Sequence, residues 1–122
     1  MLDDDRGTLM IVTLSGQTVG SISYHAVRYG PNVASRAYNI GLSITPENRG
    51  KGYGSEAQRL LAEYLLQTFP IARVEAQTDI TNLAEQRALE KAGFVREGVL
   101  RKAQSRAGDW HDLVVYSTVR GD

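Results

Sequence analysis

Three glycines at alternate positions, Gly50, Gly52 and Gly54, constrain the fold of this chain more than any other feature. They follow residues 38–44, whose alternation of apolar and polar side chains predicts a half-buried strand. They precede residues 57–65, whose apolar positions lie on one face of a helix of about three to four turns. A turn without side chains leaves backbone N–H groups bare at the positive end of that helix, so the pattern predicts an anion site.

Two basic residues at the glycines indicate which kind of anion the turn would bind. Arg49 and Lys51 add positive charge suited to a diphosphate. A P-loop needs serine or threonine directly after the lysine, where Gly52 stands, and a dinucleotide fingerprint needs glycine where Ser55 stands. The alternative is a glycine-rich turn that only connects a strand to a helix, and Arg49 together with the flanking strand and helix argues against it.

The remaining segments predict one α/β domain over residues 1–122. Residues 9–12 and 19–22 predict a hairpin, residues 27–35 a loop, 72–77 a strand, 82–92 a helix ended by Gly93, and residues 94–100 and 110–119 two closing strands. The order is therefore ββ, β, α, β, α, β, β. The strand, glycine turn, helix and strand in the middle predict a right-handed crossover.

Composition excludes several functional classes. Fourteen basic and fourteen acidic residues cancel, so we expect no nucleic-acid partner and no membrane partner. The absence of cysteine excludes disulfides, thiolate metal sites and cysteine catalysis. Two histidines far apart in sequence are a poor ligand set, so no metal is expected. The acidic start is unlike a signal peptide, and a cytoplasmic protein is predicted.

Two separate motifs resemble one family. Arg49, Gly52 and Gly54 match the pattern Q/R-x-x-G-x-G/A of GNAT N-acetyltransferases. Residues 82–94 look like the asparagine-led helix of that family, which ends in K-x-G-F. The tail is similar to the RimJ/RimL-type branch, and the resemblance covers nearly the whole chain from Leu9 onward.

This resemblance implies the GNAT fold, an N-terminally shortened mixed sheet with mostly antiparallel strands, a central splayed parallel pair and two helices. It implies acetyl-CoA as cosubstrate between the splayed strands. The backbone of Leu42 and Ile44 would pair with the pantetheine arm, and the Ile44 N–H would donate to the thioester oxygen. The implied cofactor-binding residues are Leu42, Ile44, Arg49, Gly50, Lys51, Gly52, Tyr53, Gly54, Ser55 and Asn82.

The catalytic candidates are Ile44, Asn82 and Glu85. Leu89 stands where the family commonly has a tyrosine that acts as the general acid, and Glu85 stands where the branch often has serine. Glu85 is a candidate base or a ligand for a cationic amine, and alternatively the capping-box partner of Asn82. Asn82 itself either binds the cofactor arm or a water near the sulfur, or only caps its helix.

Other polar and aromatic residues are expected to be structural. The two imidazoles are possible bases, but both are expected in strands, in solvated or structural roles. Tyr38 and Tyr116 are expected in the core. Trp110 is expected to pack, and Asp112 is expected to order the closing strands. The two imidazoles are those of His25 and His111.

The predicted activity is transfer of an acetyl group to a primary amine, on a protein N-terminus or a small molecule, by direct attack in a ternary complex. Family members usually begin with a strand and two helices before the hairpin, so we expect a truncated chain, a mis-started frame or a shortened enzyme. The exposed sheet edge predicts a homodimer. The alternatives are a non-catalytic acyl-CoA-binding or sensing module, and an incomplete domain stabilised by a partner.

Overall fold

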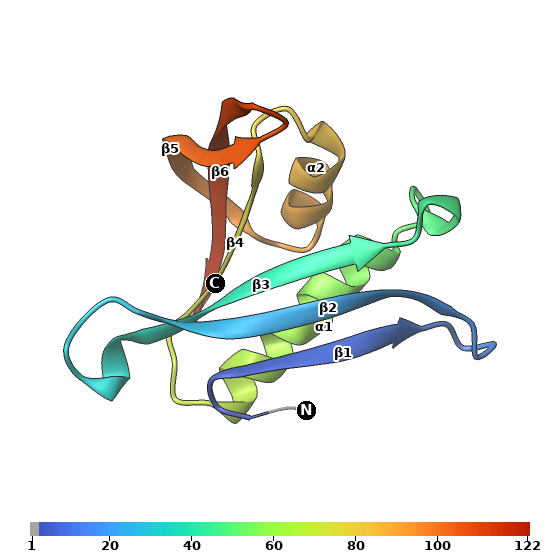
Figure 1. The fold of residues 1–122 in the computed structure, drawn as a ribbon. Coiled ribbons are helices and arrows are strands. Elements are labelled where there is room, and N and C mark those ends of the chain that lie inside the picture. Colours follow the sequence, from blue (N-terminus) through green and yellow to red (C-terminus); the bar gives the residue numbers. More distant parts are fainter. Residues whose placement is uncertain (1–2) are drawn as a thin grey trace.

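A computed structural model describes residues 3–122 (Figure 1). Within them the elements are β1 (Arg6–Val12), β2 (Thr18–Arg28), β3 (Arg36–Ile44), α1 (Tyr53–Thr68), β4 (Arg73–Asp79), α2 (Leu83–Lys91), β5 (Val95–Arg106) and β6 (Asp109–Val119). Short 3-10 turns at Val33–Ser35 and Pro46–Asn48 flank β3. This order confirms the succession of strands and helices predicted from the sequence.

The strands form one mixed sheet in the order β1-β2-β3-β4-β6-β5, and every neighbouring pair is antiparallel except β3 and β4. The parallel pairing covers only two residue pairs, Tyr38 with Val74 and Asn39 with Glu75. Beyond Asn39 the two strands diverge, and Figure 1 shows the widening gap between them. The predicted splayed parallel pair is therefore present at the centre of the sheet.

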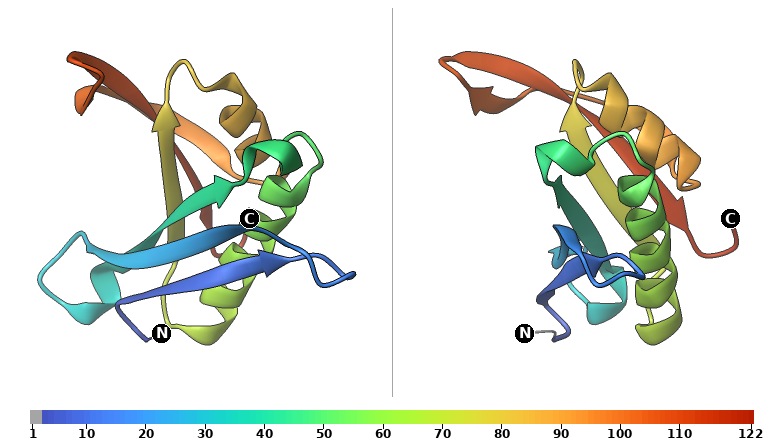
Figure 2. Two further views of the ribbon diagram at one scale, coloured as in Figure 1. Left: turned by 45° about the vertical axis from the view of Figure 1, so that its right-hand side comes forward. Right: turned by 90° about the vertical axis from the view of Figure 1, so that its right-hand side faces the viewer.

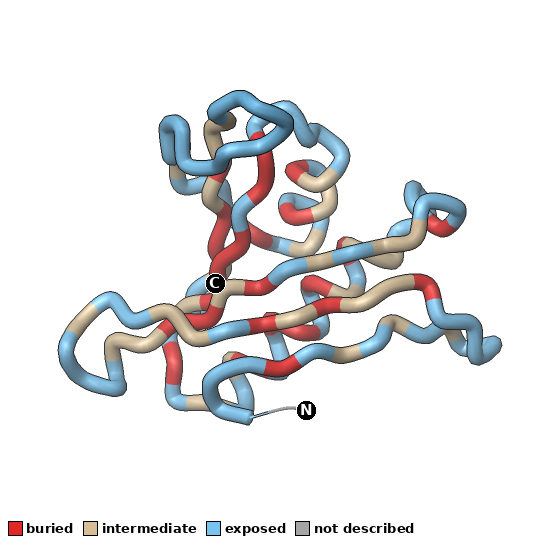
Figure 3. The backbone as a smooth tube through the Cα atoms, in the orientation of Figure 1, coloured by how far each residue is buried: buried red, intermediate tan, exposed pale blue. Residues whose placement is uncertain are grey.

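Both helices lie on the same face of the sheet (Figure 2). The core is between them and the strands, where Leu65, Leu89 and Val114 are fully buried. Figure 3 shows buried residues concentrated in β4, in the adjoining part of β6 and on the inner side of α1. Tyr38 and Tyr116 are also buried in this core, which confirms their predicted place.

The opposite face of the sheet has no helix over it among the described residues, and we call it the helix-free face. Val74 and Ala76 of β4 belong to the core, so the alternate residues of the strand project to the other side. On β4 these are Arg73, Glu75, Gln77 and Asp79. A row of polar and charged side chains therefore follows β4 on this face.

The two closing strands are longer than the sequence pattern indicated. β5 continues to Arg106 rather than to residue 100, and a tight turn at Ala107 and Gly108, both with positive φ, joins it to β6. Nearly every residue of β5 is exposed, so no alternation marked its second half. At the other end of the chain, β2 extends through Arg28 into the segment predicted to be a loop.

Two residues on the apolar face of α1 are not buried, and the packing predicted for Trp110 is wrong. Leu60 and Tyr64 are 49% and 42% exposed, because they face the side of α1 next to β1, the edge strand, and nothing among the described residues covers them. Trp110 is 60% exposed, because it lies close to the turn of the β5–β6 hairpin, where residues 101–109 are all exposed.

Candidate functional site

The glycine turn begins where β3 ends, and the side chain of Asn48 fixes the segment between them. That side chain is buried and donates from Nδ2 to Thr45 Oγ1 over 2.7 Å. Gly50 and Gly52 have φ of +76° and +87°, a region that residues with a side chain rarely adopt. Gly52 is the residue directly before α1, so the turn delivers the chain into the helix only with glycine there.

The backbone N–H groups of this turn are unpaired within the described chain. Within residues 3–122, none of the amides of residues 50–55 donates to another backbone carbonyl. No described atom lies within 4 Å of the place where a side chain would begin at Gly50 or Gly52. Arg49 and Lys51 are exposed, and neither forms an ion pair within the described chain. This is the geometry that an anion site at a helix N-terminus requires.

The free edge of β3 lies beside this turn. The Thr45 N–H donates to Val19 O of β2 over 2.9 Å. Because successive residues of a strand point their backbone groups to opposite sides, the N–H groups of Leu42 and Ile44 face away from β2 and into the gap. The Ile44 carbonyl accepts a hydrogen bond from Arg49 Nε over 3.1 Å. A side chain at Gly54 would begin 2.9 Å from Leu42 Cδ2, so glycine lets α1 start close against β3.

Asn82 caps the second helix. Its Oδ1 accepts the Glu85 N–H over 3.1 Å, as predicted. The reciprocal half of a capping box is absent, because the Asn82 N–H donates to Asp79 O over 2.8 Å and the Glu85 carboxylate turns elsewhere. The capping-box interpretation of the Glu85 side chain is therefore wrong, while Nδ2 of Asn82 has no hydrogen-bond partner within the described chain.

Gln58 connects the two helix starts. It is 1% exposed, and its Nε2 lies 3.1 Å from Gly54 O and 3.5 Å from Glu85 Oε1. Burial raises the pKa of Glu85 to about 7, and the contact with Gln58 opposes this shift only partly. Sequence reasoning missed Gln58, although it lies three residues before the buried Leu61 and therefore on the buried side of the helix.

A second polar cluster lies at the end of β4, on the helix-free face. Asp79 is 4% exposed, and its Oδ1 accepts the Thr81 N–H and Oγ1–H over 2.9 and 2.8 Å. Its Oδ2 is 2.7 Å from His111 Nδ1 and 2.9 Å from Arg106 Nη2. The Thr81 hydrogen bonds first, and then the nearby His111 and Arg106 side chains, hold the pKa of Asp79 below its usual range.

Sequence reasoning did not find Asp79, because nothing local indicates which of the distant cations a strand carboxylate will meet. The expectation that Asp112 orders the closing strands is confirmed, because its Oδ1 accepts the Lys102 N–H over 2.8 Å and its carbonyl accepts the Ile80 N–H over 3.0 Å. His25 is exposed on β2, opposite Asn39. Among residues 3–122 no three histidine, aspartate or glutamate side chains form a metal-binding group, and no helix has the length and apolar character to cross a membrane.

The structure thus brings the predicted cofactor residues to one place: the free edge of β3, the glycine turn and the start of α2. Comparison with known proteins shows the family of the chain. The family described as the acetyltransferase (GNAT) domain matches residues 2–95. The chain belongs to the GNAT acetyltransferase family.

Relatives of this GNAT chain are longer. The probable N-acetyltransferase YjcK of Bacillus subtilis is 34% identical over 104 residues, which cover 85% of this chain and 56% of YjcK. The chain therefore spans just over half the length of such a curated relative. The assignment to the RimJ/RimL-type branch stays a prediction.

Solved structures share the fold. A GNAT-family acetyltransferase from Bacillus anthracis superposes with a TM-score of 0.80 at 25% identity, over 94% of this chain and 67% of that one. The spermidine N-acetyltransferase of Vibrio cholerae, solved with CoA and spermine, superposes with a TM-score of 0.83 at 17% identity, over 96% and 67% of the two chains. The sheet with its single parallel pair and two helices is the GNAT fold, as the resemblance implied.

The pKa of Glu85 predicts a specific pH dependence of stability. Its folded-state pKa of about 7 lies above the ordinary value of 4.5, so its contribution to stability is present below pH 4.5 and is lost as the pH rises through 7. Glu85→Gln removes this loss. We expect the unfolding free energy of the variant, relative to wild type, to rise by about 1–3 kcal/mol between pH 4.5 and pH 8 in urea titrations.

The control is Glu56→Gln, at an exposed position in the first turn of α1. It should leave the pH dependence of the unfolding free energy as in wild type. A Glu85→Gln variant whose stability difference from wild type is the same at both pH values would show that the Glu85 carboxyl is not buried in this way.

Proposed function

We propose that this protein transfers an acetyl group from acetyl-CoA to a primary amine by direct attack in a ternary complex. One observation carries the proposal: an open gap between β3 and β4 lies beside a turn whose amides at the start of α1 have no backbone acceptor. Membership of the GNAT acetyltransferase family supports it, as does the complex of the spermidine N-acetyltransferase with CoA and spermine.

The cofactor-binding residues act in two groups. The amides of residues 50–55, with the side chains of Arg49 and Lys51, bind the diphosphate at the positive end of α1. The gap-facing backbone groups of Leu42 and Ile44 bind the pantetheine arm as an added strand would be bound. Asn82 offers the same arm its amide Nδ2, because its Oδ1 is already used to cap α2.

Acyl transfer needs a donor at the thioester oxygen and a proton for the departing sulfur. The Ile44 N–H supplies the first, which stabilises the developing negative charge by about 3 kcal/mol. Leu89 is fully buried and apolar at the position of the usual acid, so we assign the second role to Glu85. With a pKa of about 7 its carboxyl still holds a proton in much of the population at neutral pH, and it lies on the helix side of the sheet near the start of α1.

A thiol-release assay with acetyl-CoA and a panel of amines tests this function. The panel holds peptides with free N-termini, polyamines and small primary amines, with mass spectrometry to identify the acetylated product. We expect release with at least one class, and a kcat about 100-fold lower in Glu85→Gln. The control Glu63→Gln, which removes an exposed partner of Arg59, should stay within about twofold of wild type.

The same assay separates the alternatives. Tight binding of acetyl-CoA with no thiol release from any amine would contradict the enzyme and favour a non-catalytic acyl-CoA-binding module. Failure to bind any CoA thioester would favour an incomplete domain that needs a partner. An unchanged kcat in Glu85→Gln would contradict the role assigned to that carboxyl alone.

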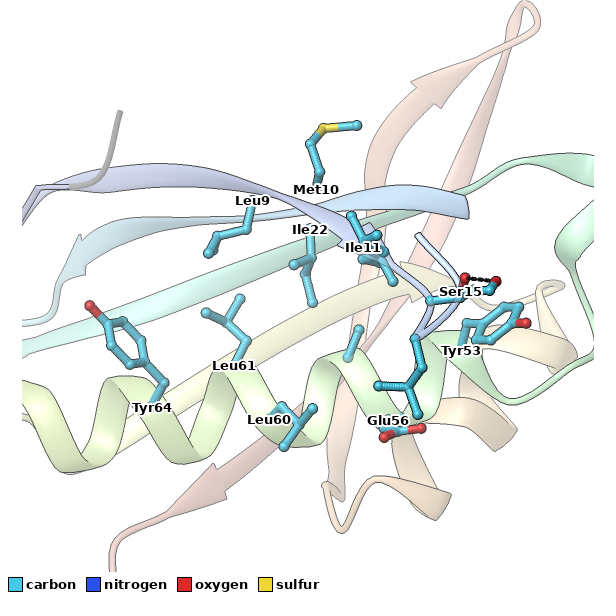
Figure 4. Close-up of a pocket in the computed structure, with 14 residues that line it drawn as sticks. Leu9, Met10, Ile11, Ser15, Ile22, Tyr53, Glu56, Leu60, Leu61 and Tyr64 are labelled. Atoms are coloured by element: carbon cyan, nitrogen blue, oxygen red, sulfur yellow. Dashed lines mark hydrogen bonds between the residues drawn. The ribbon is translucent and has the colours of Figure 1, made fainter. Parts of the chain in front are cut away.

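We also propose a homodimer through the β1 edge. A groove of about 860 Å³ separates β1 from α1, and Figure 4 shows Leu9 and Leu61 projecting into it from the two sides. Met10 and Leu60 are 61% and 49% exposed, and the outer edge of β1 pairs with no described strand. An apolar groove beside an unpaired edge is a surface that a second copy covers well.

Sedimentation at micromolar concentration tests the dimer. We expect a dimeric mass for wild type and a monomeric mass for Leu60→Lys, because a charge placed in the groove would be buried without a partner. The control Leu100→Lys alters a residue of similar exposure on β5, the opposite edge strand, and should remain dimeric. A monomeric wild type, or a dimeric Leu60→Lys variant, would contradict the proposed interface.

A further inference from the structure

The pair formed by Asp79 and His111 lies on the face of the sheet opposite the two helices. We propose that His111 Nε2 takes the proton from the acceptor amine as the amine enters the gap from the helix-free face, and that Asp79 holds the imidazole in place. This inference rests on the proposed acetyl transfer and adds to it the group that activates the amine.

The support for His111 is rigid. Asp79 is 4% exposed and is fixed through Oδ1 by two hydrogen bonds from Thr81, and its Oδ2 lies 2.7 Å from His111 Nδ1 in an ion-pair contact that lacks hydrogen-bond geometry. A carboxylate on one ring nitrogen sets the tautomer and the orientation of the ring, which leaves the other nitrogen as the basic one. Within residues 3–122, Nε2 of His111 has no hydrogen-bond partner, and the side chain is 24% exposed.

Arg106 keeps the imidazole available as a base. Its Nη2 lies 2.9 Å from the same Asp79 oxygen and already balances the carboxylate charge. The Asp79 carboxylate therefore does not depend on a charge on His111 to be balanced. The other carboxylate of β4 on this face, Glu75, is instead closed off by Tyr29, whose hydroxyl hydrogen-bonds to it, and by Arg73, 3.6 Å away.

Asp79 lies on β4, the strand that borders the gap, four residues beyond the last parallel pair. Continuing the parallel register from Asn39 and Glu75 sets Leu42 level with Thr78, and the next residue of β3 level with Asp79. Leu42 and Thr78 thus border the gap where the thioester would lie between the diverging strands. Because Asp79 projects to the helix-free face, it places His111 on the side of the sheet that faces away from the helices.

The proton balance follows from this geometry. An acceptor ammonium gives one proton to His111 Nε2, directly or through one water, and becomes the neutral amine. Its nitrogen then forms a bond to the carbonyl carbon while the carbon–sulfur bond breaks. The second proton of the nitrogen passes to solvent water, while the departing thiolate takes the proton of Glu85 on the other face and the Glu85 carboxylate is reprotonated from solvent. The net product is an amide, a thiol and one proton, which His111 returns to solvent.

His111→Gln tests the inference against His25→Gln, which alters the chain's other histidine at an exposed position of β2. We expect His111→Gln to lower kcat/KM for the amine about 100-fold near pH 7 and to bind acetyl-CoA with unchanged Kd. The loss should shrink as the pH approaches the pKa of the amine itself. Added imidazole should restore part of the activity in His111→Ala, and His25→Gln should match wild type.

Two results would overturn the inference, and they differ. An active wild type whose His111→Gln variant keeps the same kcat/KM and pH profile contradicts the role of His111 and leaves the acetyltransferase intact. No thiol release from wild type with any amine contradicts the acetyltransferase and this inference together. Asp79→Asn adds a readout independent of turnover: nitrogen NMR should show the Nδ1–H tautomer of neutral His111 in wild type and its loss in the variant, and the Nε2–H tautomer in wild type would contradict the pair.

Discussion

The divergence of β3 and β4 after two residue pairs is the constraint on which the rest of the structure depends. It leaves the N–H groups of Leu42 and Ile44 without a strand partner, which is costly unless something else pairs with them. Side chains pack or bond at the point of divergence on both faces. Leu42 packs against the start of α1 at Gly54, and on the other face Asn39 Nδ2 donates to Gln77 Oε1 over 3.0 Å where the strands part. The gap is thus a built feature of the sheet, with the glycine turn at its edge.

The two faces of the sheet divide the chemistry. The helix side carries the glycine turn, the start of α2 and a carboxyl with a pKa raised by burial, Glu85. The helix-free face carries carboxylates paired with basic side chains, such as Asp79 with His111 and Arg106. A thioester held in the gap would therefore meet its amine from one face and release its thiolate towards the other, so proton removal and proton supply fall to groups that do not interfere with each other.

Local patterns predicted the elements well and their long-range contacts poorly. The glycine spacing, the alternation in residues 38–44 and the cap at Asn82 depend on neighbours in sequence, and each corresponds to an observed feature. Gln58 and Asp79 depend on partners 27 and 32 residues away, which no local pattern indicates. Leu60 follows the periodicity of a buried face but is half exposed, because burial also requires an element to cover it and β1 is the edge of the sheet.

Calorimetric titration with acetyl-CoA tests the central claim most directly, that the glycine turn and the free edge of β3 hold an acyl-CoA. The account predicts micromolar binding to wild type, weakened at least about tenfold in an Arg49→Ala, Lys51→Ala variant, because two charge-assisted contacts to the diphosphate are lost. The control is Arg59→Ala, which alters a residue in the second turn of α1 that is paired with Glu63. This variant should bind acetyl-CoA as wild type does. No binding to wild type, or equal binding by the double variant, would contradict the account.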